Sequence, residues 1–97
     1  MKIQILDQAK RDLIEGFRFY EAQREGLGAY FLANLYADID SLKAFAGTHS
    51  RPYHDYHRLL SKKFPFAVFY KIDNEVVRVY AVLDCRRNPA WIRTKLQ

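Results

Sequence analysis

The sequence is poor in cysteine, glycine and proline, and it lacks a long apolar run. Its 97 residues include one cysteine, Cys85, with four glycines and three prolines. A single cysteine excludes an intrachain disulfide, which fits a reducing cytosol. The apolar runs are far too short to cross a bilayer. Because an alternating polar and apolar stretch follows Met1 directly, we expect no signal peptide, a cytoplasmic location and no membrane partner.

The motifs of common enzyme classes are missing as well. We find no phosphate-binding glycine loop, no pair of carboxylates at catalytic spacing and no serine–histidine–acid set. His54 and His57 have a spacing that can hold zinc on a helix, but Pro52 and the strand-like run that follows argue against a helix there. We therefore predict a structural or solvent-facing role for these histidines, no metal site and no cofactor.

The composition is that of a small folded domain with its positive charge in one half. Hydrophobic residues make up 49% and aromatic residues 15%, enough for a core, so we expect one domain over residues 1–97. Residues 57–97 contain nine Lys or Arg against three Asp or Glu, whereas residues 1–56 contain seven against eight. This asymmetry predicts a scaffold followed by a cationic half that meets an anionic surface or an acidic partner.

Apolar periodicity predicts an N-terminal strand and a helical hairpin. Residues 2–6 alternate as a strand does, and Asp7 stands where a helix N-cap belongs. A helix then extends to about Arg24, and Gly26 and Gly28 bracket a tight turn. The apolar stripe of the first helix is Ala9, Leu13, Phe17 and Tyr20, and that of the second is Phe31, Leu35, Ile39, Leu42 and Ala46.

The second half reads as three strands and a terminal helical turn. The predicted strands are residues 57–60, 66–72 and 75–84, with Asp73-Asn74 as a hairpin turn. Asn88-Pro89 ends the strands, and residues 90–96 form a short helix. The predicted fold is therefore α+β, in the order β-α-α-β-β-β, with the helical hairpin packed on a mostly antiparallel sheet.

Two stretches of this chain resemble the RelE/ParE superfamily, the small toxins of bacterial type II toxin–antitoxin, or plasmid stabilisation, modules. They are YEAQREGLGAYF, across the helical hairpin, and FPFAVFYKIDNEVVRVYAVLDCRRNP, across the last strands. The resemblance covers nearly the whole chain. It implies a cognate acidic antitoxin that neutralises the protein, and it implies one of two targets: ParE-type members poison DNA gyrase, whereas RelE-type members cleave mRNA on the ribosome.

When the RelE-type site is matched to this sequence, two of its positions hold residues that cannot do the catalytic work of the arginine and tyrosine found there in RelE-type members. The arginine after the last strand matches Arg86, with Arg87 beside it. The middle-strand arginine falls at Ala67, and the C-terminal tyrosine falls at Trp91 or Ile92. Cleavage by 2′-hydroxyl attack needs a base, an acid and cations at the phosphate, so losing these groups favours the ParE-like branch. Many ParE-like members have a histidine before the double arginine, whereas this chain has Asp84-Cys85 at that place.

We therefore predict a growth-inhibiting toxin that binds DNA gyrase and is not a nuclease. The alternative is a ribosome-dependent mRNA endoribonuclease, and a third possibility is a non-toxic member that only binds its partner. Strand alternation would let at most one arginine of the pair point into a groove, and a solvated pair remains the simplest reading of both. The predicted target- or antitoxin-binding residues are Arg58, Lys62, Lys63, Arg86, Arg87 and Trp91, and for a nuclease they are Arg58, Lys62, Lys63 and Arg86, assisted by His57.

Overall fold

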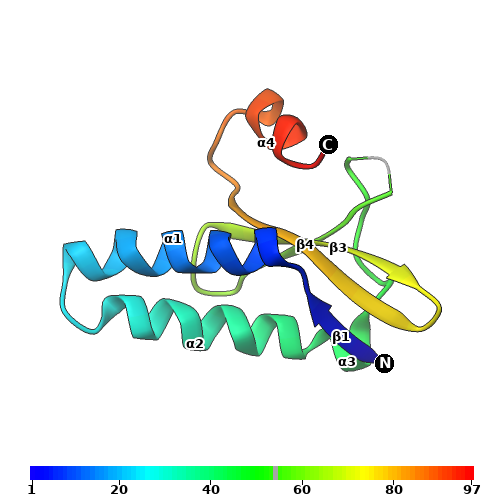
Figure 1. Cartoon of the computed structure of the whole chain (residues 1–97), viewed down its shortest axis with the longest axis horizontal. Coiled ribbons are helices and arrows are strands. Elements are labelled where there is room, and N and C mark those ends of the chain that lie inside the picture. The colour runs from blue at the N-terminus through cyan, green and yellow to red at the C-terminus, as the bar shows by residue number, and fades with distance from the viewer. Residues whose placement is uncertain (54) are drawn as a thin grey trace.

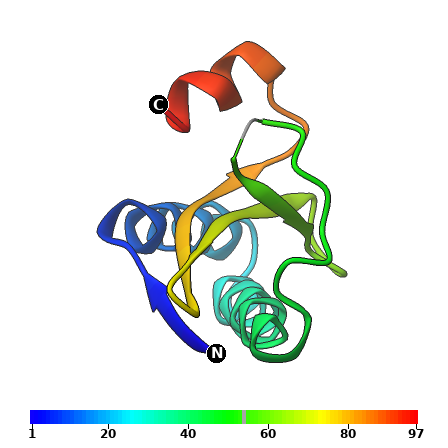
Figure 2. The same ribbon diagram turned by 90° about the vertical axis from the view of Figure 1, so that its right-hand side faces the viewer.

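The structure, a computed structural model, describes residues 1–53 and 55–97. Within these residues the order is β1 (Lys2–Ile5), α1 (Asp7–Gln23), α2 (Leu27–Asp40), α3 (Leu42–Phe45), β2 (His57–Leu60), β3 (Phe66–Asp73), β4 (Val76–Asp84) and α4 (Pro89–Lys95). The helices α1 and α2 lie side by side against one face of the sheet, and α4 lies over the other face (Figures 1 and 2). This arrangement confirms the predicted α+β fold.

The helical hairpin turns at Gly26, which has a φ of 87° and needs glycine's freedom there. Gly28 belongs to α2 rather than to the turn, and it is buried where α2 approaches α1, since a Cβ there would lie 2.7 Å from the Phe17 side chain. The Glu21 carboxylate accepts hydrogen bonds from the backbone N–H groups of Gly26, at 3.0 Å, and Gly28, at 2.9 Å. Glu21 thus supplies the cap that the glycine at the start of α2 cannot.

The start of α1 differs from the prediction by one residue. Leu6, in extended conformation, occupies the N-cap position, and its side chain cannot cap the helix. Asp7 instead lies in the first turn, where its charge is favourable for the helix dipole. The predicted stripe of the second helix is confirmed as buried at Phe31, Leu35, Ile39 and Leu42, although the helix is interrupted at Ser41 between α2 and α3.

Four strands of the described residues form one sheet in the order β1-β4-β3-β2. β1 pairs with β4 in parallel, and the other two pairings are antiparallel. The β3–β4 turn has positive φ at Asn74 and Glu75, so it lies one residue beyond the predicted Asp73-Asn74. Between Phe69 and Tyr70 the register with β4 shifts by one residue, as at a β-bulge.

The sheet separates two apolar clusters. The larger lies under the helical hairpin and includes Val68, Tyr70, Val77, Val79 and Val82 from the strands. The smaller lies under α4 and contains Ala67, Phe69, Ala81, Leu83, Ile92 and Leu96. Burial on both sides explains why β3 reads as a continuous apolar run. In residues 1–53 and 55–97, no helix is long and apolar enough to cross a membrane.

Candidate functional site

An open groove lies where α1, the end of β4 and α4 come together. Its volume is about 260 Å³. Its floor is apolar and its rim carries charges of both signs. The lining residues are Asp12, Glu15, Gly16, Phe19, Phe66, Val82, Leu83, Asp84, Arg87, Trp91 and Lys95. Concave apolar surfaces with a few charged groups are common binding sites, so this groove is the candidate site.

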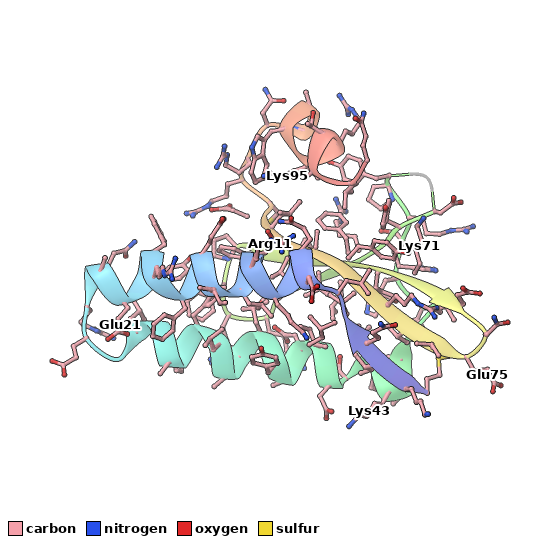
Figure 3. All side chains as sticks on the ribbon, in the orientation of Figure 1. Arg11, Glu21, Lys43, Lys71, Glu75 and Lys95 are labelled. Carbon is pink, nitrogen blue, oxygen red and sulfur yellow. The ribbon has the colours of Figure 1, made fainter. Side chains whose placement is uncertain are left out.

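The cationic wall of the groove comes from the turn after β4 and from α4. The guanidinium carbon of Arg87 lies 3.9 Å from the centre of the Trp91 ring, and the Lys95 ammonium lies 5.5 Å from it. Both distances fit cation–π contacts. Figure 3 shows Lys95 on the side of α4 that is nearer to α1. Trp91, one of the predicted binding residues, is half-buried under these two cations.

The start of α4 positions this wall. The Asn88 side chain accepts a hydrogen bond from the Ala90 N–H at 2.7 Å, and Pro89 occupies the first turn of the helix. Asparagine at the N-cap followed by proline is a strong helix start. Ile92 and Leu96 then anchor α4 on the sheet, and the Tyr56 hydroxyl donates to the Leu96 carbonyl at 2.8 Å. Arg87 and Trp91 are thereby held together on a short, fixed element.

The two arginines of the pair have different surroundings. Arg86 turns back onto Asp84, with its Nε and Nη2 atoms donating to the two carboxylate oxygens at 3.0 and 2.7 Å. The hydrogen bond from the Arg86 side chain holds the pKa of Asp84 below its usual value. The Arg86 side chain is still 61% exposed. Arg87 alone lines the groove, as the prediction of at most one inward arginine requires.

The opposite wall is formed by α1, and its carboxylate Asp12 is 5% exposed. β1 ends at Ile5, so β4 beyond Val79 has no strand neighbour on that side. Asp12 fills the gap by accepting a hydrogen bond from the Val82 N–H at 3.0 Å, and Gln8 donates to its other oxygen at 2.8 Å. Burial raises the pKa of Asp12. This carboxylate therefore fixes α1 to the sheet at the floor of the groove.

The remaining predicted cations lie around β2, outside the groove. Lys62 and Lys63 are exposed in the turn between β2 and β3, and Arg58 lies on β2 opposite Phe69. Since Phe69 faces α4, Arg58 is on the α4 side of the sheet. Among the described residues, Arg58 Nε is buried without a hydrogen-bond partner. The structure thus brings Arg87 and Trp91 together and separates them from these three residues.

His57 lies on the other face of the sheet from Arg58. Its ring stacks on Tyr70 with the centroids 5.0 Å apart, and its Nδ1 lies 2.8 Å from the His49 carbonyl. Tyr70 packs in the cluster under the helical hairpin. Adjacent residues of a strand point to opposite faces, so His57 and Arg58 cannot converge on one substrate. His54 of the histidine pair lies outside the described residues.

Ala67, matched to the RelE-type arginine, is fully buried, and Ile92, one of the two positions matched to the tyrosine, is 3% exposed, both in the cluster under α4. Trp91, the other position matched to the tyrosine, lies at the groove under Arg87 and Lys95. In the part of the chain that the structure describes, no group of three His, Cys, Asp or Glu side chains could hold a metal ion. The arrangement offers recognition by an apolar groove, an arginine on an indole and nearby carboxylates.

Several groove residues were not predicted from the sequence. Phe19 could have been found, because it falls outside the apolar stripe predicted for the first helix, and in the structure it is 54% exposed. No local pattern predicts the roles of Asp12 and Lys95, because these depend on where β1 ends and how α4 folds back.

Comparison with known proteins gives a match in structure but not in sequence. No protein-family model and no curated protein matches the sequence. The fold is similar to that of a chain in a solved structure described as "Chromosomal ParDE TA system from P. aeruginosa". The TM-score is 0.74 at 15% identity, covering 84% of this chain and 92% of that chain. The expected likeness to ParE-like proteins is thus confirmed for the fold.

Proposed function

We propose that this chain is the toxin of a bacterial type II toxin–antitoxin module. It acts in the cytoplasm, binds and poisons DNA gyrase, and is neutralised by a cognate acidic antitoxin. The observation that carries the proposal is the open groove with Arg87 seated on Trp91, in a fold shared with a chain of a ParDE system. Arginine and tryptophan are the residue types that most often dominate the binding energy of protein interfaces.

The groove suits a protein partner better than a small substrate. Its floor includes Phe66, Val82 and Leu83, and the exposed Phe19 ring stands at its side. An apolar side chain of a partner would fill the floor, and a partner carboxylate would pair with Arg87 or Lys95 on the rim. A buried apolar anchor next to a charged hydrogen bond is a common arrangement at such hot spots.

A binding mode of action is supported over RNA cleavage by the surroundings of Ala67 and Ile92. Both are packed in the apolar cluster under α4, where a phosphate could not be stabilised without exposing that cluster. His57 faces the other side of the sheet, so it does not supply the missing acid or base. We infer that the protein acts by occupying a surface of its target.

The test is expression in bacteria from a tightly repressed promoter. We expect growth arrest, induction of the SOS response and gyrase–DNA complexes that can be trapped, all relieved by co-expression of the cognate acidic antitoxin. Arg87→Ala and Trp91→Ala should each abolish arrest, whereas Lys43→Ala should retain it. Lys43 is a suitable control because it is an exposed cation at α3, away from the groove (Figure 3), and it pairs with Asp40.

A ribosome-dependent endoribonuclease remains the second candidate because of the cations around β2. Arg58, Lys62 and Lys63 form no ion pair with the described residues, so their charge is available to an RNA backbone. Primer extension on mRNA from induced cells distinguishes the two functions. Cuts between codon positions, with chromosomal DNA intact, would replace gyrase by the ribosome as the target.

A further inference from the structure

The outer edge of β1 carries backbone groups without partners. β1 is the last strand of the sheet on the side opposite to β2 (Figure 2). The Leu6 N–H donates to the Val79 carbonyl at 3.0 Å, and in a parallel pairing every second residue of a strand bonds to the same neighbour, so Gln4 also bonds to β4. The N–H and C=O groups of Ile3 and Ile5 therefore point outward. In the part of the chain that the structure describes, these groups have no hydrogen-bond partner.

A hollow lies beside this edge, between β1 and the helices α2 and α3. Its volume is about 280 Å³, and its lining residues are Ile3, Ile5, Tyr36, Ile39, Asp40 and Lys43. The two charged residues pair with each other at 2.8 Å, so they give the hollow no net charge. Tyr36 is 46% exposed, and the two strand isoleucines are only partly buried. The edge thus joins free backbone groups to an apolar surface that has no excess charge.

A charged side chain of opposite sign lies at each end of the strand. Lys2 begins β1, and Asp7 lies two residues after its end. Both side chains are exposed, and neither forms an ion pair with the described residues. Two copies of such a strand are complementary when they run antiparallel, because the cationic end of one then lies beside the anionic end of the other.

We propose that this edge binds a second copy of the chain, with the two β1 strands pairing antiparallel about a two-fold axis that relates the two Gln4 residues. In this register Ile3 of one copy lies opposite Ile5 of the other, and their outward N–H and C=O groups form four hydrogen bonds. Alternate residues of a strand share a face, so the isoleucine side chains of both copies meet on the helix side and cover the two hollows. The proposal goes beyond the proposed function because it concerns how the chain assembles with itself.

The charges of this register favour a second copy. Lys2 of each copy lies opposite Leu6 of the other, next to Asp7, so each end of the paired strands gains an ion pair. The two Lys2 residues are about four positions apart along the pairing, roughly 13 Å. This separation exceeds the screening length of about 8 Å at physiological ionic strength. Attraction between unlike charges therefore outweighs repulsion between like charges.

An acidic segment of another protein suits this edge less well. Its carboxylates would gain Lys2, but Asp7 would repel them, and the hollow with its internal ion pair would not attract them. A two-fold pairing instead closes this edge on both copies at once, so assembly through it stops at a dimer. Because β1 has four residues, the interface is small, and we expect a dissociation constant of about 10–500 μM.

Sedimentation velocity of the purified full chain, from about 5 μM to about 500 μM, measures this dimer across the expected range of affinity. We expect a monomer at the low end and a growing dimer fraction at the high end. Hydrogen exchange over the same series locates the contact, since the amides of Ile3 and Ile5 should exchange more slowly as the dimer forms. The Gln4 amide, which already bonds to β4 in the monomer, should change little and serves as the internal control.

Charge reversal tests the register. Lys2→Glu and Asp7→Lys should each weaken self-association about tenfold, because the two-fold axis places the changed pair at both ends of the contact. A one-to-one mixture of the two variants should associate as tightly as wild type, since the two reversed charges then meet each other. Lys62→Glu makes the same charge change beside β2 and should leave the dimer unchanged. Circular dichroism checks that each variant is folded, and the exchange measurement needs no variant.

A protein that stays monomeric to about 500 μM would overturn the proposal, as would exchange at Ile3 and Ile5 that does not depend on concentration. A mixture that associates no better than the single variants would overturn the antiparallel pairing, and a dimer disrupted by Lys62→Glu alone would move the contact to β2. Protection of Ile3 and Ile5 by an added glutamate–valine peptide, with the chain still monomeric, would overturn the proposal in favour of an acidic partner. Growth arrest by a monomeric protein contradicts the dimer alone, and a dimer without growth arrest contradicts the proposed function alone.

Discussion

Replacing Asp12 tests whether a buried carboxylate substitutes for a missing strand. Asp12→Ala would leave the Val82 N–H without its acceptor at a position that is 1% exposed. An orphaned buried donor costs about 1–3 kcal/mol of unfolding free energy. Asp12→Asn, by contrast, keeps an amide oxygen for Val82, and the Gln8 amide can turn to accept from the new NH₂ group.

Ionisation of Asp12 should also make the stability of the protein depend on pH. Burial is the main cause of its raised pKa, with Glu15 adding to the shift and the Val82 and Gln8 hydrogen bonds opposing it. A carboxyl with a raised folded-state pKa contributes stability that is fully present below its ordinary pKa of 3.8 and is lost as pH rises through the raised value. Asp12→Asn, which cannot ionise, should therefore gain stability relative to wild type as pH increases from about 4 to 7.

The assay is urea unfolding followed by circular dichroism at several pH values, with melting temperature as a second measure. For a domain of this size, each kcal/mol corresponds to about 4–8 °C in melting temperature. We expect Asp12→Ala to be clearly destabilised at pH 7 and Asp12→Asn to be close to or above wild type. Equal losses for both variants, or an alanine variant as stable as wild type, would refute the role of Asp12 as the acceptor for Val82.

Three further predictions concern the scaffold. Glu21→Ala should lower the unfolding free energy by about 1–2 kcal/mol, as loss of a helix cap does, while Glu21→Asp, which is too short to reach the turn, should give no rescue in the same urea assay. Gly16→Ala should destabilise the protein despite alanine's better helix propensity, since its Cβ would lie 2.5 Å from the Phe31 ring; a higher melting temperature would contradict this close packing. Burial, and then the nearby His57, lower the pKa of His49, whose Nδ1 lies 2.5 Å from the Tyr70 hydroxyl. The stability that neutral His49 contributes to the fold is therefore present above its ordinary pKa of 6.5 and is lost as pH falls through the lowered value. His49→Gln should flatten this acid-side loss, and an unchanged pH profile would exclude His49 as its source.

The sequence alone determined the elements and the fold class. The strands and helices were predictable because alternating and helical periodicities are local properties of the chain, and β2 lies where a strand of residues 57–60 or slightly longer was predicted. The turn between β3 and β4 was predicted one residue too early. Asparagine and aspartate tolerate positive φ, which favoured Asp73-Asn74, but the structure has positive φ at Asn74 and Glu75.

The tertiary structure alone decided how the candidate residues are grouped. Arg86 and Arg87 are adjacent in sequence, yet Asp84 holds the first while Trp91 holds the second at the groove. Asp12 and Val82 meet because β1 stops short and leaves a backbone donor free, which no local pattern encodes. The groove exists because α4 folds back over the sheet, and contacts between segments so far apart in the chain depend on packing rather than on periodicity.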